Sequence, residues 1–243
     1  NPPFIRTNVP HFTIIWGVRP LIGGFFVKNR NCILFDLDGT LSDPGEGIIG
    51  SLIHALRHFG IEGDPALLRT FIGPPLVDSF RLHFNFDEEQ TAEAIRVYRA
   101  HFHDHGLFKN VIYPGIPELL RDLTKQGKTL AIATTKPTVY ALEVLKFFGI
   151  DQYFPEELVM GSFLDGRRTD KSELIATVLK KLGGAPADKV MVGDRKFDII
   201  GAKANGLDVI GVTYGYGERE ELEALVPTTI VSSVEELRRL LLG

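Results

Sequence analysis

Two aspartates, two residues apart, end a short apolar run near the start of the sequence. The run begins at Cys32, and Asp36 and Asp38 close it just before Gly39. An apolar run of this length, bounded by a turn signal, predicts a strand that is buried on both faces. Because side chains alternate along a strand, the two carboxylates would project to the same side. They would repel each other without a cation or a shared proton, so the pair predicts a functional site.

Further polar side chains stand where other predicted strands end or helices begin. They are two hydroxyls, a lysine and two more carboxylates: Thr134, Thr135, Lys171, Asp194 and Asp198. The carboxyl ends of parallel strands meet at one edge of a sheet, so we expect these residues to share a crevice with Asp36 and Asp38. Oxygen ligands of this kind suit Mg²⁺, which proteins hold with a few carboxylates, waters and substrate phosphate.

Two carboxylates in such a crevice could hydrolyse a phosphate ester. One can attack phosphorus and form an aspartyl-phosphate, which divides one difficult displacement into two easier ones. It needs no activating base, because carboxylates are ionised at neutral pH. The other can protonate the leaving oxygen and later take a proton from the attacking water. A hydroxyl, a lysine and a metal ion would stabilise the negative charge on the phosphoryl oxygens.

The elements that must position these residues alternate between strands and helices. Strands are predicted at 129–134, 158–160, 189–192 and 209–213, and helices at 118–126, 139–148, 171–182, 198–204 and 234–242. This alternation is typical of an α/β fold, a Rossmann-like parallel sheet with helices on both faces. The strand at Cys32 belongs to the same sheet.

Between these parts of the sheet, the chain has helical periodicity without a strong strand pattern. Apolar residues recur at three- and four-residue spacing from Ile48 to Phe59, and the pattern continues from Asp87 to about His105. We therefore expect residues 46–113 to form an inserted small α-helical cap domain. Residues 31–45 and 114–243 then form the α/β core.

Composition and charge exclude several classes of protein. Apolar residues are 44% and charged residues 24% of the 243, as in soluble globular proteins, and the formal net charge of −4 gives no basic excess for a nucleic-acid polymer. No apolar run reaches the ~18 residues of a membrane span. The single cysteine, Cys32, excludes an intramolecular disulfide and fits a reducing compartment. We expect a cytoplasmic protein without a membrane partner.

Residues 1–30 differ in character from the rest of the chain. They contain four basic residues and four prolines but no acidic residue and no serine. Prolines interrupt any amphipathic helix, and glycine, arginine and proline break the apolar patches, so neither a transit peptide nor a secretory signal is favoured. We expect an N-terminal extension of unclear role.

Four segments resemble, in order, the signature motifs of the haloacid dehalogenase-like superfamily in its phosphatase branch. They are Asp36-Leu37-Asp38-Gly39-Thr40, Thr134, Lys171 and Gly193-Asp194-x-x-x-Asp198. The resemblance extends over residues 31 to about 215. It implies that Asp36 is the nucleophile and Asp38 the general acid and base, and that the helical insertion is a cap that closes over a small phosphorylated metabolite.

The same resemblance implies the ligands. It assigns the substrate phosphate to Thr134 and Lys171, and Thr135, at the same predicted strand end, is a further candidate for phosphate binding. It assigns Mg²⁺ to Asp36, the backbone carbonyl of Asp38, and Asp194, with Asp198 in support. Gly73-Pro74-Pro75-Leu76 and Tyr113-Pro114-Gly115 are similar to phosphoglycolate-phosphatase-like proteins and their 5′-nucleotidase relatives. Many relatives carry Lys-Pro-x-Pro at the third motif, whereas this chain has Asp170-Lys171-Ser172-Glu173, which favours the nucleotidase-like subset.

Two other functions remain open at this point. A phosphosugar mutase of the same superfamily would use the same Asp36 and Asp38, but mutases similar to β-phosphoglucomutase usually carry Glu-Asp-Ser where this chain has Gly193-Asp194-Arg195. A non-catalytic binding protein on this fold is the other alternative, and the intact set of motif residues speaks against it.

Several polar residues compete for supporting roles. Lys136, Arg167 and Arg168 are alternative phosphate cations to Lys171, and Lys136 is otherwise expected to be a solvated loop residue. Candidate substrate contacts in the helical insertion are Glu46, Arg57, Arg81 and Arg99. His101, His103 and His105 alternate, and on a helix they should point in different directions, so a solvated face is favoured over a transition-metal site.

Overall fold

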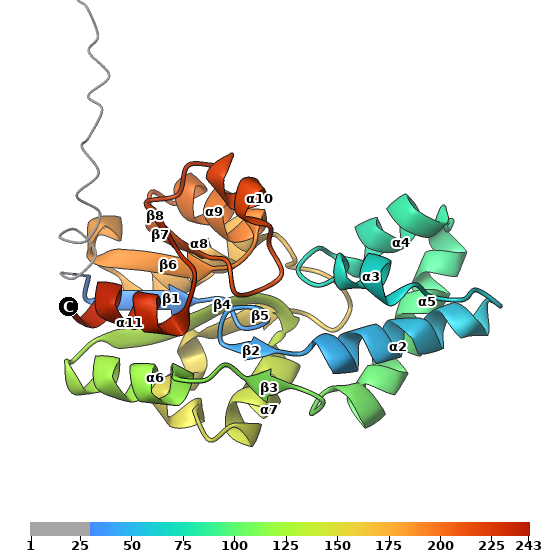
Figure 1. Ribbon diagram of the computed structural model, residues 1–243, viewed down its shortest axis with the longest axis horizontal. Coiled ribbons are helices and arrows are strands. Elements are labelled where there is room, and N and C mark those ends of the chain that lie inside the picture. The colour runs from blue at the N-terminus through green and yellow to red at the C-terminus, as the bar shows by residue number, and fades with distance from the viewer. Residues whose placement is uncertain (1–29) are drawn as a thin grey trace, which may run out of the picture.

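A six-stranded parallel sheet forms the centre of the protein in the computed structural model, which describes residues 30–243 (Figure 1). The strands are β1 (Cys32–Phe35), β4 (Thr129–Pro137), β5 (Val159–Ser162), β6 (Lys189–Gly193), β7 (Asp208–Val212) and β8 (Thr229–Val231). Their order is β5-β4-β1-β6-β7-β8, with parallel pairing throughout. The predicted α/β, Rossmann-like class is confirmed, and β1 lies inside the sheet between β4 and β6.

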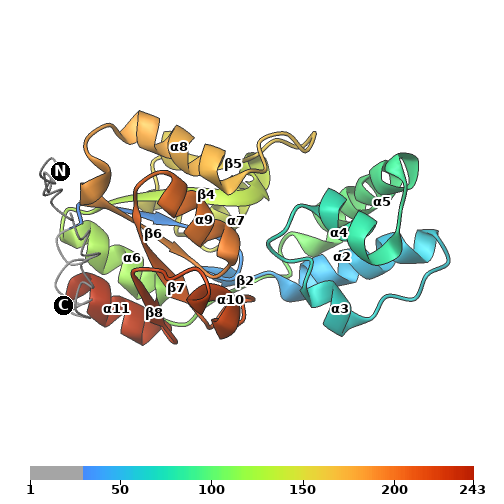
Figure 2. The same ribbon diagram turned by 90° about the horizontal axis from the view of Figure 1, so that it is seen from above.

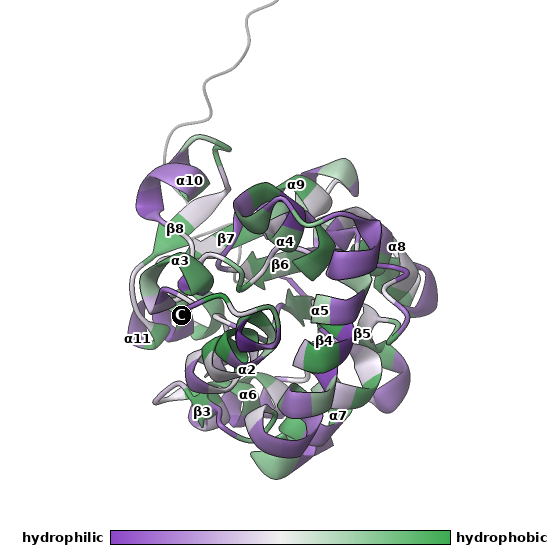
Figure 3. Ribbon diagram, turned by 90° about the vertical axis from the view of Figure 1, so that its right-hand side faces the viewer, coloured by the Kyte–Doolittle hydropathy of each residue, from purple (hydrophilic) through white to green (hydrophobic). Residues whose placement is uncertain are grey.

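Different helices cover the two faces of the sheet. Successive side chains of each strand point to opposite faces, so neighbouring residues of one strand pack against different helices. Ile33 and Phe35 of β1 belong to the apolar cluster that α6, α7 and α11 complete, whereas Leu34 belongs to the cluster of α8, α9 and α10. These helices are α6 (Ile116–Lys125), α7 (Thr138–Phe147), α8 (Lys171–Leu182), α9 (Lys196–Ala204), α10 (Arg219–Glu223) and α11 (Val234–Leu242). In Figure 3 the central strands are mainly green, and most purple ribbon lies on the surrounding helices.

Four helices lie beyond the carboxyl ends of the strands, to one side of the sheet (Figure 2). They are α2 (Gly45–His58), α3 (Pro65–Arg69), α4 (Leu76–Phe84) and α5 (Glu88–His101). The chain leaves the sheet through β2 (Ser42–Asp43) and returns through β3 (Val111–Ile112), and these two short strands pair antiparallel. Buried Phe71, in the loop after α3, packs edge to face against buried Phe80 of α4. The limits 46 and 113 of a cap domain stay a prediction.

Several short elements differ from expectation. The sequence pattern predicts no strand at β2, β3 or β8, each of which has two or three residues. The short helical turns are η1 (Phe102–Gly106), η2 (Asp151–Tyr153), η3 (Glu156–Leu158) and η4 (Pro186–Asp188). His101 and His105 lie four residues apart, a spacing that places two side chains on one face of a helix, and their ring centroids are 5.0 Å apart, which corrects the expectation that they diverge.

The expectation for residues 1–30 lies outside the described residues, apart from Arg30. The guanidinium of Arg30 forms an ion pair with Asp208, the first residue of β7. Within residues 30–243, no helix is both long and apolar enough to span a membrane.

Candidate active site

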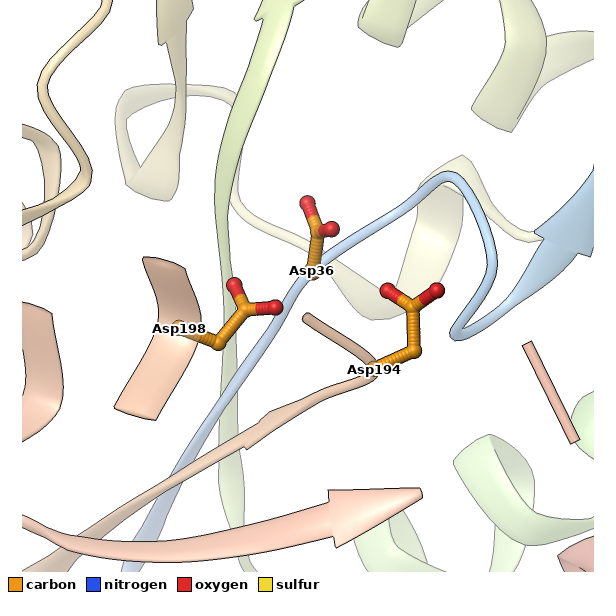
Figure 4. Close-up of side chains that lie close together, drawn as sticks. All are labelled: Asp36, Asp194 and Asp198. Carbon is orange, nitrogen blue, oxygen red and sulfur yellow. The ribbon is translucent and has the colours of Figure 1, made fainter. Parts of the chain in front are cut away.

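Three carboxylates meet at the carboxyl edge of the sheet (Figure 4). Asp36 follows β1, Asp194 follows β6, and Asp198 lies in the first turn of α9. One oxygen from each lies within 4.8 Å of the other two, and all three side chains are buried. The neighbouring central strands β1 and β6 therefore bring together residues that are about 160 positions apart in the chain, as the strand-end rule predicts.

Glycines make room for this cluster. A Cβ on Gly39 would lie 2.1 Å from Oδ2 of Asp194, and Gly39 has φ +87°, which L side chains rarely adopt. A Cβ on Gly193 would lie 2.2 Å from Cγ of Asp198. The backbone can approach the carboxylates this closely only because both positions lack a side chain.

Backbone donors fix the orientation of two of the carboxylates. The Tyr216 N–H donates to Oδ2 of Asp194 at 2.8 Å, and the hydroxyl of Thr40 lies 3.5 Å from Oδ1. The Arg195 N–H donates to Oδ2 of Asp198 at 3.0 Å, which is the usual return contact of an acidic residue in the first turn of a helix. The free oxygens of the cluster can therefore point toward a common ligand.

Lys171 is the cation of the cluster. Its Nζ lies 2.9 Å from Asp36 and 2.8 Å from Asp198, and it donates to the carbonyl of Ala133 at 2.9 Å. Lys171 is the first residue of α8, where the helix dipole disfavours a positive charge, so the two carboxylates must compensate. The side chain is only 4% exposed. The structure thus brings Lys171 to the carboxylates, and phosphate binding by Lys171 stays a prediction.

Burial and mutual repulsion shift the protonation of this cluster. Burial raises the pKa of Asp194 well above its ordinary value, and the charges of Asp36 and Asp198 raise it further. Burial also raises the pKa of Asp198, to about 6, although Lys171 acts in the opposite direction. Burial alone would lower the pKa of Lys171, but Asp198 and Asp36 outweigh it and the pKa is raised.

The donor set fits a hard divalent cation. Three buried carboxylates face one lysine, so the cluster has an excess of two negative charges when all three are ionised, and Asp194 has no ion-pair partner among residues 30–243. Buried carboxylates without such compensation are costly, and Mg²⁺ takes oxygen ligands of this type. Asp36, Asp194 and Asp198 are also the only group of histidine, cysteine or acidic side chains in this part of the chain with metal-ligand spacing. The three carboxylates therefore fit a metal ion, whereas Mg²⁺ itself and the Asp38 carbonyl as a ligand stay predictions.

Asp38 does not join this cluster and pairs instead with Lys136. Nζ of Lys136 lies 2.8 Å and 3.1 Å from the two oxygens of Asp38. The Lys136 side chain is 3% exposed and lies in the last part of β4, so the expectation of a solvated loop residue is wrong. Burial raises the pKa of Asp38, while Lys136 lowers it. The two aspartates of the first motif thus have separate lysine partners.

The two threonines at the end of β4 have different surroundings. Thr134 is buried, and its hydroxyl oxygen accepts from the Lys136 N–H at 3.2 Å. The Thr135 hydroxyl donates to the carbonyl of Gly73, in the loop between α3 and α4, at 3.3 Å. Phosphate binding by either residue stays a prediction, and Thr135 has a second role that the sequence does not indicate.

A cavity of about 350 Å³ opens between the sheet and the helices α2, α4 and α5, beside Asp38 and Lys136. Aromatic side chains from both sides line it: Phe71, Tyr98, Phe102 and Tyr140. Arg99 lies in the lining as well, and its guanidinium donates to the carbonyl of Leu164. The volume is at the lower end of the ~300–1,000 Å³ of small-molecule sites.

The other candidate side chains lie away from the carboxylates. Arg168 donates to the carbonyl of Gly161 at 2.9 and 2.6 Å, and Arg167 forms an exposed ion pair with Asp165. Three of the four candidates in the helical insertion are exposed or outside the cavity lining: Glu46, Arg57 and Arg81. Arg99, the fourth candidate, lines the cavity.

Comparison with known proteins identifies the family of this chain. The family model described as haloacid dehalogenase-like hydrolase matches residues 33–212. A "5'-nucleotidase" of Pseudomonas aeruginosa is 47% identical over 86% of this chain and 94% of its own length. "Tyrosine-protein kinase PtkA" of Mycobacterium tuberculosis is 39% identical over 88% of this chain and 73% of its own length.

The solved structures agree with the fold. A "Putative Phosphatase from Clostridium difficile" superimposes with a TM-score of 0.80 at 48% identity. The match covers 88% of this chain and 99% of the Clostridium chain.

Proposed function

The chain is a phosphatase of the haloacid dehalogenase-like hydrolase family, and we propose that it hydrolyses a nucleoside 5′-monophosphate or a similar small phosphomonoester with Mg²⁺, through an aspartyl-phosphate. The observation that carries this proposal is the convergence of Asp36, Asp194 and Asp198 beside the separate Asp38–Lys136 pair. A cytoplasmic location stays a prediction.

In the first step, Asp36 acts as the nucleophile. A carboxylate oxygen of Asp36 attacks phosphorus, the bond from phosphorus to the leaving oxygen breaks, and Asp38 gives that oxygen a proton. Lys171 holds Asp36 at 2.9 Å and so limits the directions in which the carboxylate can point. Lys136 does the same for Asp38.

In the second step, water releases the phosphate. Asp38, now ionised, takes a proton from a water molecule whose oxygen attacks the phosphorus of the aspartyl-phosphate. The bond between phosphorus and the Asp36 oxygen breaks, and Asp36 is restored. Thr134 and Lys171 would bind the phosphoryl oxygens. Lys171 lies 2.9 Å from Asp36, and Thr134 comes two residues after Ile132, which pairs with Phe35 in the sheet.

Asp36, Asp194 and Asp198, with the carbonyl of Asp38, would hold Mg²⁺. When bound, the ion would neutralise charge on the cluster and on the phosphoryl group. The excess of two negative charges in the cluster when all three carboxylates are ionised supports this assignment.

The cavity favours a leaving group larger than glycolate. Its aromatic lining can stack on a planar ring, and a two-carbon acid would leave most of the 350 Å³ to water. Burying only ~60 Å² more apolar surface is worth about 1.5 kcal/mol, or somewhat more than tenfold in binding. The name of the Pseudomonas relative, "5'-nucleotidase", points the same way.

A phosphate-release screen tests the proposal. We expect kcat/KM for nucleoside 5′-monophosphates to exceed that for 2-phosphoglycolate by about tenfold or more. The measurement is inorganic phosphate released from a panel of nucleotide, sugar, glycolate and pyrophosphate substrates, with and without Mg²⁺. Isomerised sugar phosphate, or phosphate transferred from ATP to protein tyrosine in place of release, would contradict hydrolysis as the main activity.

Replacing Lys136 by methionine should damage the acid step selectively. The side chain keeps similar length but loses the ammonium group that holds the Asp38 oxygens at 2.8 and 3.1 Å. The pKa of Asp38 then rises further, so Asp38 keeps its proton but loses its orientation toward the leaving oxygen. General acid catalysis is worth about 10²–10⁴-fold, so we expect kcat/KM for an alkyl phosphate to fall about 10²-fold. For p-nitrophenyl phosphate the loss should be much smaller, because nitrophenolate leaves without a proton. Equal losses for both substrates would show that Lys136 does not act through Asp38.

A further inference from the structure

The loop between α3 and α4 is held against the sheet by two hydrogen bonds to consecutive carbonyls. The guanidinium of Arg195 donates to the carbonyl of Ile72, and the hydroxyl of Thr135 donates to the carbonyl of Gly73 at 3.3 Å. Thr135 lies in β4, and Arg195 follows β6. The loop, residues 71–75, also lines the cavity. It is therefore tied on the sheet side by residues from two different strand ends.

The surroundings of Arg195 suit this contact. Its Nε lies 3.0 Å from Glu221 of α10, and Glu221 also accepts from the Lys196 N–H at 2.9 Å. The arginine side chain lies between two glycines: a Cβ on Gly73 would be 3.0 Å from it, and a Cβ on Gly217 would be 3.4 Å from it. Because Glu221 occupies one edge of the guanidinium, Arg195 is oriented toward the loop and is not a free phosphate cation.

Arg195 also touches the carboxylate cluster. It directly follows Asp194 in the chain, and its backbone N–H donates to Asp198 at 3.0 Å. The same residue thus contacts a proposed Mg²⁺ ligand through its backbone and the cavity loop through its side chain. A shift of the loop relative to the sheet would have to break the side-chain contact.

We propose that Arg195 and Thr135 form a catch that holds loop 71–75 closed over the cavity, and that Arg195 is a positioning residue for the hydrolysis. With the catch closed, the loop keeps its place over the leaving group beside Asp38. Opening requires that the bonds to the Ile72 and Gly73 carbonyls break, so the catch limits how often the loop opens. The kinetic part of this inference rests on the proposed function, whereas the structural part does not.

Hydrogen–deuterium exchange of the full chain without substrate tests the structural part. In Arg195→Ala, we expect the peptide that covers residues 70–76 to exchange about tenfold faster, as for the loss of one hydrogen bond to a charged group. Arg195→Lys keeps the charge opposite Glu221 but has a single ammonium group, and should lie between the two. Arg219→Ala, which removes the exposed partner of Glu223 on the same helix, is the matched control and should exchange as the parent does.

A second variant and a kinetic measurement complete the test. Thr135→Val removes only the hydroxyl, so it keeps the test open if Arg195→Ala does not fold, and it should also speed exchange of this peptide. With a nucleoside 5′-monophosphate, Arg195→Ala should raise KM several-fold more than it lowers kcat. Unchanged exchange in folded Arg195→Ala or Thr135→Val would overturn the catch. Faster exchange in a protein that hydrolyses no phosphomonoester would support the catch and reject only the proposed function.

Discussion

Replacing Asp36 by asparagine is expected to abolish phosphate release, with a loss of at least about 10⁴-fold in kcat. A neutral amide is a poor nucleophile, so the aspartyl-phosphate cannot form. The substitution keeps the size of the side chain, and an amide oxygen can still lie near Lys171. The measurement is steady-state phosphate release together with mass spectrometry of the peptide that contains residue 36, after rapid quenching.

The control for this substitution is the same chemical change at the opposite edge of the sheet. Asp188 is exposed and precedes β6, so Asp188→Asn should keep parental activity. The parent should show a phosphorylated peptide at residue 36 and the Asp36→Asn variant should not. Substantial turnover in Asp36→Asn, or a phosphorylated peptide elsewhere in the chain, would reject Asp36 as the nucleophile.

The carboxylate cluster could be predicted from the sequence because two independent regularities coincide. Apolar runs mark the strands, and the carboxyl ends of parallel strands share an edge. Asp36 and Asp194 follow such runs directly, so their meeting depends only on β1 and β6 being neighbours. Lys171 could be anticipated because a lysine at the start of a helix needs nearby anions.

Lys136 could not be placed in this way, because the sequence ends the strand too early. The predicted strand stops at 134, whereas β4 continues to Pro137 and carries Lys136 into the interior. Its partner, Asp38, is 98 positions away, and no local pattern indicates that pair. One feature of the sequence does indicate that Lys136 faces the site. It lies two residues after Thr134, and in an extended strand residues two apart point to the same side.

Contacts between the sheet and the helical insertion depend on tertiary structure alone. The bonds from Arg195 to Ile72 and from Thr135 to Gly73 join segments whose relative position no periodicity defines. The short strands β2, β3 and β8 were missed for a related reason, since two or three residues are too few to show alternation.

Asp194→Asn is expected to weaken function and to stabilise the metal-free protein. The variant loses a proposed Mg²⁺ ligand, so we expect kcat at a fixed low Mg²⁺ concentration to fall about 10²-fold or more. Asparagine keeps an oxygen for the Tyr216 N–H, and its amide can donate to the Thr40 hydroxyl. The variant also removes one of three buried negative charges, which repel each other when no ion is bound. Ligand function and stability therefore change in opposite directions.

The stability effect should depend on pH. The pKa of Asp194 is raised in the folded protein, and that of Asp198 is raised to about 6. An aspartate in the unfolded chain has a pKa of about 3.9, so the folded state binds protons at these two groups more tightly than the unfolded chain does. The stability that these two groups contribute to the metal-free parent is therefore fully present below the unfolded pKa and is lost as pH rises through the folded pKa values. Asp194→Asn removes one of these groups, so its gain in Tm over the parent in EDTA should be larger at pH 7.5 than at pH 5.

Mg²⁺ should make the parent more stable than Asp194→Asn, because an ion that binds only the folded state stabilises it by an amount that rises with the logarithm of its affinity. At pH 7.5, added Mg²⁺ should raise the Tm of the parent clearly and the Tm of Asp194→Asn only slightly. At pH 5 the Tm of the parent should rise less, since protons compete with Mg²⁺ for the same carboxylate oxygens. Thermal unfolding in EDTA and in a Mg²⁺ series measures all of these changes. Identical changes in Tm with Mg²⁺ for parent and variant would show that Asp194 is not a ligand. A lower Tm of the variant than of the parent, in EDTA at pH 7.5, would show that repulsion among the carboxylates does not limit the stability of the metal-free protein.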